Sequence, residues 1–157
     1  MAQLKGNDRS AFVASMFGRI SRRYDLLNTL MTVGMHYMWR RKAAQLAATH
    51  VSGDILDVAS GTGDFAFDLL KHSNVNIVVG LDFSSEMLDV AIRKSVKLGL
   101  DGRFIPVIGD AHILPFPDER FASATVGFGV RNFSDLPKAL ADIVRVTRRG
   151  GKVTVLE

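Results

Sequence analysis

The sequence predicts an α/β protein with a doubly wound, parallel sheet of the Rossmann type. Short apolar runs alternate with helical patterns along residues 51–157, and this order builds a parallel sheet covered on both faces. A glycine turn, Gly61-Thr62-Gly63, follows the first apolar run and precedes a helix. An acidic residue, Asp82, ends the next apolar run. A carboxylate at that place can accept hydrogen bonds from ribose hydroxyls.

Each element has a local signal. The strands are short apolar runs bounded by turn residues, expected at residues 54–59, 76–82, 103–109, 121–127 and 152–157. The helices are expected between them at residues 64–71, 85–98 and 135–147. Ser84 or Ser85 can cap the second helix and Gly99 can end it. Pro137 fits the first turn of the third helix, and the pair at 150–151 turns the chain into the last strand.

The first 50 residues are expected to be helical. An apolar stripe at i, i+4 and i+8 comprises Phe12, Met16 and Ile20. A second helix is expected near 35–50, with Trp39, Ala43 and Leu46 on one face. We therefore divide the chain into two parts. Residues 1–50 are expected to form a helical segment that covers the ligand crevice and contacts the substrate. Residues 51–157 are expected to form a Rossmann-like domain. Because the chain stops within an apolar strand, we expect the C-terminal part of this domain to be missing.

Composition limits the class of protein. The chain has 157 residues, which is enough for one domain with a core. It has no cysteine, which excludes disulfides, thiolate metal sites and cysteine nucleophiles, and we expect no metal site. The polar N-terminus is no secretory signal, and no apolar stretch reaches the length of a membrane span. The sequence therefore predicts a cytoplasmic protein.

Charge is unevenly distributed. Residues 1–50 carry eight Lys/Arg and two Asp, a net charge of +6, whereas residues 51–157 carry a net charge of −2. A basic N-terminal third suggests an anionic partner, either membrane headgroups or nucleic acid. The alternative is a solvated helical face.

The glycine turn leaves the cofactor open. Gly61, Gly63 and Ala66 also satisfy the loose dinucleotide fingerprint, and Asp82 lies at a compatible distance along the chain. Such a turn can also bind nothing. One feature that favours S-adenosylmethionine is Asp57, which precedes the turn and can hold a cationic aminoacyl group.

Two later segments favour the same cofactor. Asp110 and Ala111 follow the third strand, where an aspartate can accept a hydrogen bond from the adenine amino group. Residues 127–135 follow the fourth strand, where a methyl acceptor would lie.

Three segments carry a resemblance to a known family. They are residues 16–41, Leu56-Asp-Val-Ala-Ser-Gly-Thr-Gly-Asp64 and Gly127-Phe-Gly-Val-Arg-Asn-Phe-Ser-Asp135. The second segment is general to the seven-stranded, class I S-adenosylmethionine-dependent methyltransferases. The first and third are specific, and on them the chain resembles the ubiquinone/menaquinone biosynthesis C-methyltransferases, which include demethylmenaquinone methyltransferases.

The resemblance implies methyl transfer from S-adenosylmethionine to a ring carbon of a polyprenylated quinol, demethylmenaquinol to menaquinol. It also implies a helix and two further strands beyond the fifth strand, which would form part of the quinol pocket. Many relatives have serine where this chain has Gly127. The cofactor contacts expected on this chain are Asp57, Gly61, Thr62, Gly63, Asp82, Phe83, Asp110, Ala111 and Gly127.

Catalytic and substrate residues are expected from residue type and resemblance together. His112 is a candidate general base, or a loop histidine that only packs or caps. Arg131 can stabilise a developing phenolate, or anchor its loop. The expected substrate contacts are Tyr24, Asp25, Asn28, His36, Trp39 and Asn132. His36 is a second candidate base, and the aromatic residues can instead be helix core.

The expected partners are a polyprenyl quinol and the inner face of a membrane, through the basic N-terminal segment, and a homodimer. We expect no nucleic acid partner, because no Asn/Asp-Pro-Pro-Tyr/Phe motif follows the fourth strand. Other readings remain open: a methyltransferase for another small-molecule acceptor, an NAD-binding module, or a non-catalytic nucleotide-binding fragment. The choice between naphthoquinol and benzoquinol is also open.

Overall fold

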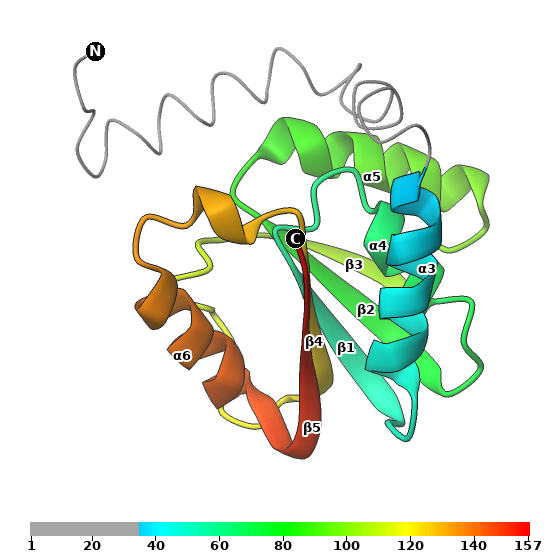
Figure 1. The fold of residues 1–157 in the computed structure, drawn as a ribbon. Coiled ribbons are helices and arrows are strands. Elements are labelled where there is room, and N and C mark those ends of the chain that lie inside the picture. The colour runs from blue at the N-terminus through cyan, green and yellow to red at the C-terminus, as the bar shows by residue number, and fades with distance from the viewer. Residues whose placement is uncertain (1–34) are drawn as a thin grey trace.

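A computed structural model describes residues 35–157 and gives an α/β fold with helices on both faces of one sheet (Figure 1). In chain order the elements are α3 (Met35–Ala48), β1 (Gly53–Val58), α4 (Asp64–Leu69), β2 (Val75–Asp82), α5 (Ser85–Lys97), β3 (Phe104–Ile108), β4 (Phe121–Gly127), the 3₁₀ helix η1 (Val130–Asn132), α6 (Leu136–Val146) and β5 (Thr147–Leu156).

The sheet has five strands in the order β3-β2-β1-β4-β5, and every neighbouring pair is parallel. The order reverses at β1, so the chain leaves β1 and β4 toward opposite sides of the sheet. Parallel α/β sheets bind ligands at this reversal, beyond the carboxyl ends of the strands. The predicted doubly wound sheet is therefore confirmed, and its crevice lies between the ends of β1 and β4.

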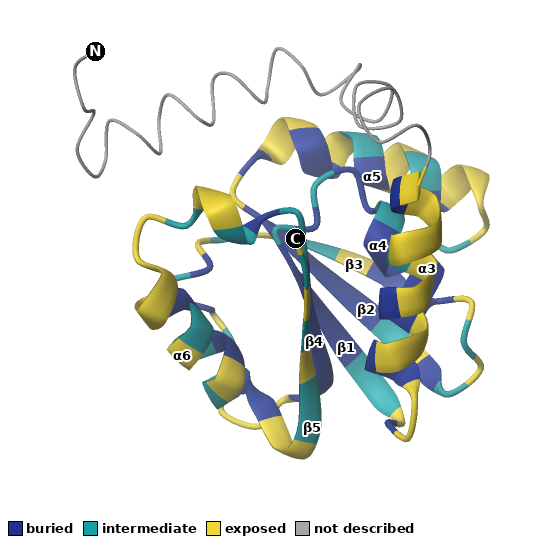
Figure 2. Ribbon diagram, in the orientation of Figure 1, coloured by how far each residue is buried: buried dark blue, intermediate teal, exposed yellow. Residues whose placement is uncertain are grey.

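Two apolar clusters fill the two sides of the sheet. The buried residues, dark blue in Figure 2, lie along the central strands and on parts of the helices that cover them. On the side of α3, α4 and α5, Phe104 of β3 packs edge-on against Phe67 of α4, with ring centroids 5.3 Å apart. On the other side, α6 buries Ala139, Ile143 and Val146 against β1 and β4. Each large side chain buried in this way stabilises the fold by roughly 1.5–3 kcal/mol.

The face of α3 that meets the rest of the fold contains only one of the three residues that the sequence places on one face. Ala43 is buried, whereas Trp39 and Leu46 are exposed, at 41% and 56%. The buried stripe is instead built from small side chains, namely Ala43, Ala44, Ala47 and Ala48. Alanine lets a helix backbone approach its neighbours closely, whereas the indole of Trp39 would hold it away.

The predicted boundary at residue 50 stays a prediction, because residues 1–34 lie outside the described part of the chain. Within the described part, α3 shares the core of the α/β unit. No helix of residues 35–157 is long and apolar enough to cross a membrane.

The helix ends follow the sequence signals closely. Of the two candidate caps, Ser84 is the N-cap of α5, because its hydroxyl accepts the amide N–H of Met87. Asp135 caps α6 by accepting the amide N–H of Lys138 at 3.1 Å. The last strand differs: β5 begins at Thr147 rather than at 152. A register shift and a positive φ of 75° at Gly150 place a bulge inside the strand, where a turn was predicted.

Candidate active site

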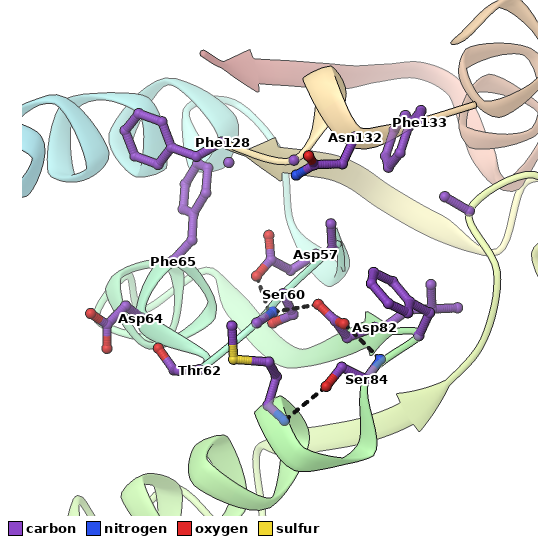
Figure 3. Close-up of a pocket in the computed structure, with 18 of the residues that line it drawn as sticks. Asp57, Ser60, Thr62, Asp64, Phe65, Asp82, Ser84, Phe128, Asn132 and Phe133 are labelled. Carbon is purple, nitrogen blue, oxygen red and sulfur yellow. Dashed lines mark hydrogen bonds between the residues drawn. The ribbon is translucent and has the colours of Figure 1, made fainter. Parts of the chain in front are cut away.

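A cavity of about 120 Å³ lies at the carboxyl edge of the sheet (Figure 3). The glycine turn after β1, the end of β2 and the end of β4 supply its walls. The glycine turn contributes Ala59, Ser60, Gly61 and Thr62; β2 and the start of α5 contribute Leu81, Asp82, Phe83, Ser84 and Met87; the β4 end contributes Gly127, Phe128 and Gly129. The cavity therefore occupies the place where the strand order reverses, as the sequence predicts.

Asp82 joins two turns of the cavity wall through hydrogen bonds. Its side chain is buried, one carboxylate oxygen accepts the amide N–H of Gly61 at 2.7 Å, and the other accepts that of Ser84 at 2.9 Å. Burial raises the pKa of Asp82, although these amide hydrogen bonds oppose the shift. Gly61 has φ +56°, and a glycine meets this backbone requirement without strain. The carboxylate has about four acceptor sites, more than the backbone hydrogen bonds it accepts, so Asp82 retains acceptor capacity for a ligand hydroxyl.

Asp57, at the end of β1, is a second buried carboxylate in the same cavity. It is 1% exposed, and its oxygens accept hydrogen bonds from the hydroxyls of Ser60 at 2.8 Å and Thr125 at 2.7 Å. Burial raises its pKa to about 6. Within residues 35–157, no ion pair joins Asp57 or Asp82 to a cation. Two buried acids without a paired cation make the cavity suited to a positively charged ligand.

The other predicted cofactor contacts surround these acids. Thr62 lines the cavity and its hydroxyl accepts a hydrogen bond from Lys94 at 3.1 Å. Phe83 and Ala111 also line it, but Gly63 and Asp110 do not. No group of three His, Asp or Glu side chains that could hold a metal occurs in the described part of the chain.

Asp110 and His112 are hydrogen-bonded to each other beside the cavity. The Nδ1 of His112 pairs with the carboxylate of Asp110, which also accepts the backbone N–H of His112. The Nε2 of His112 accepts the amide N–H of Asp135 at 3.2 Å. Partial burial alone would raise the pKa of Asp110. The hydrogen bonds from His112 outweigh this effect, so the pKa is lowered. Because His112 does not line the cavity and both its nitrogens are engaged, this geometry favours the reading in which it caps the loop.

The predicted substrate residues, together with the predicted catalytic residue Arg131, divide into three groups. His36 and Asn132 line the cavity, and His36 is 4% exposed. Trp39 and Arg131 do not line it, and Arg131 pairs with the carboxylate of Glu157 with most of its side chain in solvent. Tyr24, Asp25 and Asn28 lie outside the described residues. The roles assigned to all of them stay predictions.

Aromatic walls of the cavity were missed by sequence reasoning. Phe65 comes from the first turn of α4, and Phe128 and Phe133 flank η1 (Figure 3). Ala59 and Phe128 both have φ near +55°, a region that non-glycine residues rarely adopt and that clusters at functional sites. An apolar residue directly after a strand-end turn was the available signal for Phe65 and Phe128.

Gly127 is packed directly against one of these walls. A Cβ added at Gly127 would lie 2.6 Å from Cδ1 of Phe65, so serine, expected here in many relatives, requires the ring to move. We expect Gly127→Ser to lower the free energy of unfolding by about 1–3 kcal/mol through overpacking. Adding Phe65→Leu should recover part of this cost. Urea unfolding of the single and double variants measures both effects.

The matched control is Gly102→Ser, because a Cβ at Gly102 meets no atom within 4 Å. Equal destabilisation by the two serine substitutions, or strictly additive effects of Gly127→Ser and Phe65→Leu, would contradict the assigned contact.

The fold and the site define a Rossmann-like protein of the methyltransferase type. Among solved structures, a protein of Methanococcus maripaludis assigned as an S-adenosylmethionine-dependent methyltransferase has a TM-score of 0.72 and 25% identity, covering 99% of this chain and 66% of that one. The sequence profile of the ubiE/COQ5 methyltransferase family matches residues 3–157. The chain belongs to this family, which confirms the resemblance.

Two relatives show how far the similarity extends. Demethylmenaquinone methyltransferase of Thermus thermophilus is 46% identical over 142 residues, covering 90% of this chain and 64% of the relative. The ubiquinone/menaquinone biosynthesis C-methyltransferase UbiE of Dinoroseobacter shibae is 37% identical over 154 residues, covering 98% of this chain and 62% of the relative. The chain thus spans slightly less than two thirds of these relatives.

Proposed function

We propose that the protein transfers a methyl group from S-adenosylmethionine to a ring carbon of a polyprenylated quinol in menaquinone or ubiquinone biosynthesis, with demethylmenaquinol as the preferred acceptor. The observation that carries the proposal is the pair of buried carboxylates, Asp57 and Asp82, beside the glycine turn. Family membership supports the same reaction class. One relative is named a demethylmenaquinone methyltransferase and another a ubiquinone/menaquinone biosynthesis C-methyltransferase.

The residues present fit the cofactor in chemistry. Asp82 offers acceptors for the two ribose hydroxyls. Asp57 offers a negative charge for the ammonium of the aminoacyl group. Phe83, Leu81 and Ala111 give an apolar wall suited to the adenine ring. When bound, the cofactor supplies an electrophilic methyl group on a sulfonium, and a direct transfer needs no covalent nucleophile from the chain.

The protein's own contribution is alignment of the acceptor and removal of its proton. The rings of Phe65, Phe128 and Phe133 line the cavity and would hold a flat acceptor and exclude water, which promotes an in-line transfer. A quinol ring carbon becomes nucleophilic when a neighbouring hydroxyl loses its proton. We propose that His36, which lines the cavity, accepts this proton. Asn132 would accept a hydrogen bond from the acceptor hydroxyl.

The proposal is tested first by isothermal calorimetry with S-adenosylmethionine, 5′-methylthioadenosine and NAD. We expect the first two to bind and NAD not to bind. Methyl transfer to a short-chain demethylmenaquinol, followed by mass spectrometry, then tests the acceptor. Binding of NAD but not of the adenosyl ligands by folded protein would overturn the proposal in favour of a dinucleotide module.

A polyprenylated acceptor dissolves in a bilayer, so the proposal extends to transient binding at the inner membrane surface through the basic residues among 1–50. Sedimentation with anionic and with neutral vesicles tests it, and only the anionic vesicles should retain the protein at low salt. Light scattering tests the proposed homodimer, and a duplex DNA binding assay should show no salt-sensitive complex.

A further inference from the structure

Arg40 brings a positive charge into a cavity whose other buried charges are acidic. It lies on α3, one turn after His36, and lines the same cavity. Its side chain is 13% exposed. Nε donates to the carboxylate of Asp68 at 2.6 Å, and Nη1 donates to that of Asp64 at 2.9 Å. The two aspartates lie on α4, so they hold the guanidinium in a fixed place between two helices.

These two aspartates are not paired with Arg40 alone. Asp64 also pairs with Lys94 at 2.9 Å, and Asp68 also pairs with Lys71 at 2.6 Å. Each of the two carboxylates is therefore shared between Arg40 and a lysine. A guanidinium has five N–H donors, and the hydrogen bonds of Arg40 within residues 35–157 use two of them. Donor capacity on the guanidinium therefore remains for a ligand anion.

The cavity is thus lined by a cation, Arg40, and by a buried acid, Asp57. Burial raises the pKa of Asp57, and the charge of Arg40 opposes that rise. An α-amino acid group carries its ammonium and its carboxylate on one carbon atom. A ligand whose ammonium is held by Asp57 therefore keeps its carboxylate near. Among residues 35–157, Arg40 is the Lys or Arg side chain that lines this cavity together with Asp57.

We propose that Arg40 binds the α-carboxylate of the cofactor's aminoacyl group, with Asp64 and Asp68 as positioning residues that orient the guanidinium. This inference rests on the proposed function, because it assigns one end of the same cofactor. It makes Arg40 a specificity determinant, since adenosyl ligands without a carboxylate gain nothing from it. A hydrogen-bonded charge pair of this kind typically contributes a factor of about 10 to 100 in affinity.

The test compares three ligands on the full chain by calorimetry. S-adenosylmethionine has the carboxylate and the ammonium, its decarboxylated form has the ammonium alone, and 5′-methylthioadenosine has neither. Arg40→Gln should weaken S-adenosylmethionine by about 10- to 100-fold and change the other two little. Arg40→Lys should recover part of the loss, because it restores the charge without the fork geometry.

Lys71→Gln is the matched control, because Lys71 shares Asp68 with Arg40 but does not line the cavity. It should leave all three affinities unchanged. If it reproduces the Arg40→Gln pattern, the effect passes through Asp68 and the inference fails.

Other outcomes separate the inference from the proposed function. Equal weakening of S-adenosylmethionine and its decarboxylated form by both Arg40 variants would overturn the inference while the cofactor stands. If Arg40→Gln misfolds and loses all three ligands, Arg40→Lys replaces it as the test variant. Equal loss of all three ligands by Arg40→Lys would also overturn the inference. A wild-type protein that is folded and binds none of the three would overturn the cofactor assignment, and the inference with it.

Discussion

Replacement of Asp82 by alanine should abolish measurable binding of S-adenosylmethionine and of 5′-methylthioadenosine alike. The carboxylate is the acceptor for the amide N–H groups of Gly61 and Ser84, so its removal loosens both turns that shape the cavity. It also removes the acceptor proposed for the ribose, which both ligands contain. Hydrogen bonds to a charged acceptor are each worth about 1.5–3 kcal/mol, so a loss of at least about 100-fold in affinity is expected.

The same variant should lower the free energy of unfolding by about 1–3 kcal/mol, because two amides lose their acceptor. Urea unfolding measures this loss, and calorimetry measures binding under conditions in which the variant is folded. Asp89→Ala is the control, since it removes an exposed acid of α5. Affinity of the Asp82 variant within about threefold of wild type would contradict the assigned role, because that difference is below 1 kcal/mol.

The sheet and its two acids could be predicted because their signals are local. Alternating apolar runs and helical patterns fix a parallel sheet, and the carboxyl ends of neighbouring parallel strands meet at one edge. Asp57 and Asp82, each at a strand end, therefore had to lie near one another. Their registers confirm it: Asp57 pairs with Gly80 of β2, two positions before Asp82.

The remaining wall of the cavity depends on contacts between distant segments, which no local pattern encodes. Phe65 packs against Gly127 only because the first turn of α4 lies beside the end of β4. Arg40 reaches the cavity only because a stripe of alanines lets α3 approach.

Residue type alone also did not determine the partners of the two expected catalytic side chains. His112 was a base candidate by its chemistry, yet Asp110 and Asp135 engage its two nitrogens. The charge of Arg131 is directed to Glu157. Such choices among polar partners are set by tertiary geometry, so the sequence offered candidates without being able to rank them.

Asp57→Asn should stabilise the unliganded protein at pH 7 while it abolishes tight binding of S-adenosylmethionine. Burial raises the pKa of Asp57 from its ordinary value of 3.8 to about 6, so at pH 7 the folded chain contains a buried charge that the unfolded chain holds in water. A difference of about 2 pKa units corresponds to roughly 3 kcal/mol. Asparagine has the same shape and can still bond the hydroxyls of Ser60 and Thr125, with one of the two bonds reversed.

The sign of the pH dependence follows from proton binding. Between about pH 4 and pH 6 the folded state holds a proton on Asp57 that the unfolded state has released, so stability falls as pH rises through this window. Below about pH 4 both states are protonated, and above about pH 6 neither is, so the contribution of Asp57 is constant on both sides. The raised pKa of buried Asp82 acts in the same direction. Urea unfolding at pH 4, 5, 6 and 7 should show this decline in wild type, and a smaller decline in Asp57→Asn.

Binding of a cationic ligand should favour the ionised form of Asp57 over the protonated form. The ammonium of S-adenosylmethionine stabilises the ionised form of Asp57, so binding releases a proton at pH 5, and affinity should be about tenfold lower at pH 5 than at pH 7. For 5′-methylthioadenosine, which has no ammonium, the change should be small, and Asp57→Asn should bind it almost as wild type does. If Asp57→Asn is less stable than wild type at pH 7 and retains S-adenosylmethionine, the buried charge is not the determinant of the site. If it is more stable and selective for the uncharged ligand, the positive charge of the cofactor offsets the cost of burying the ionised carboxylate of Asp57.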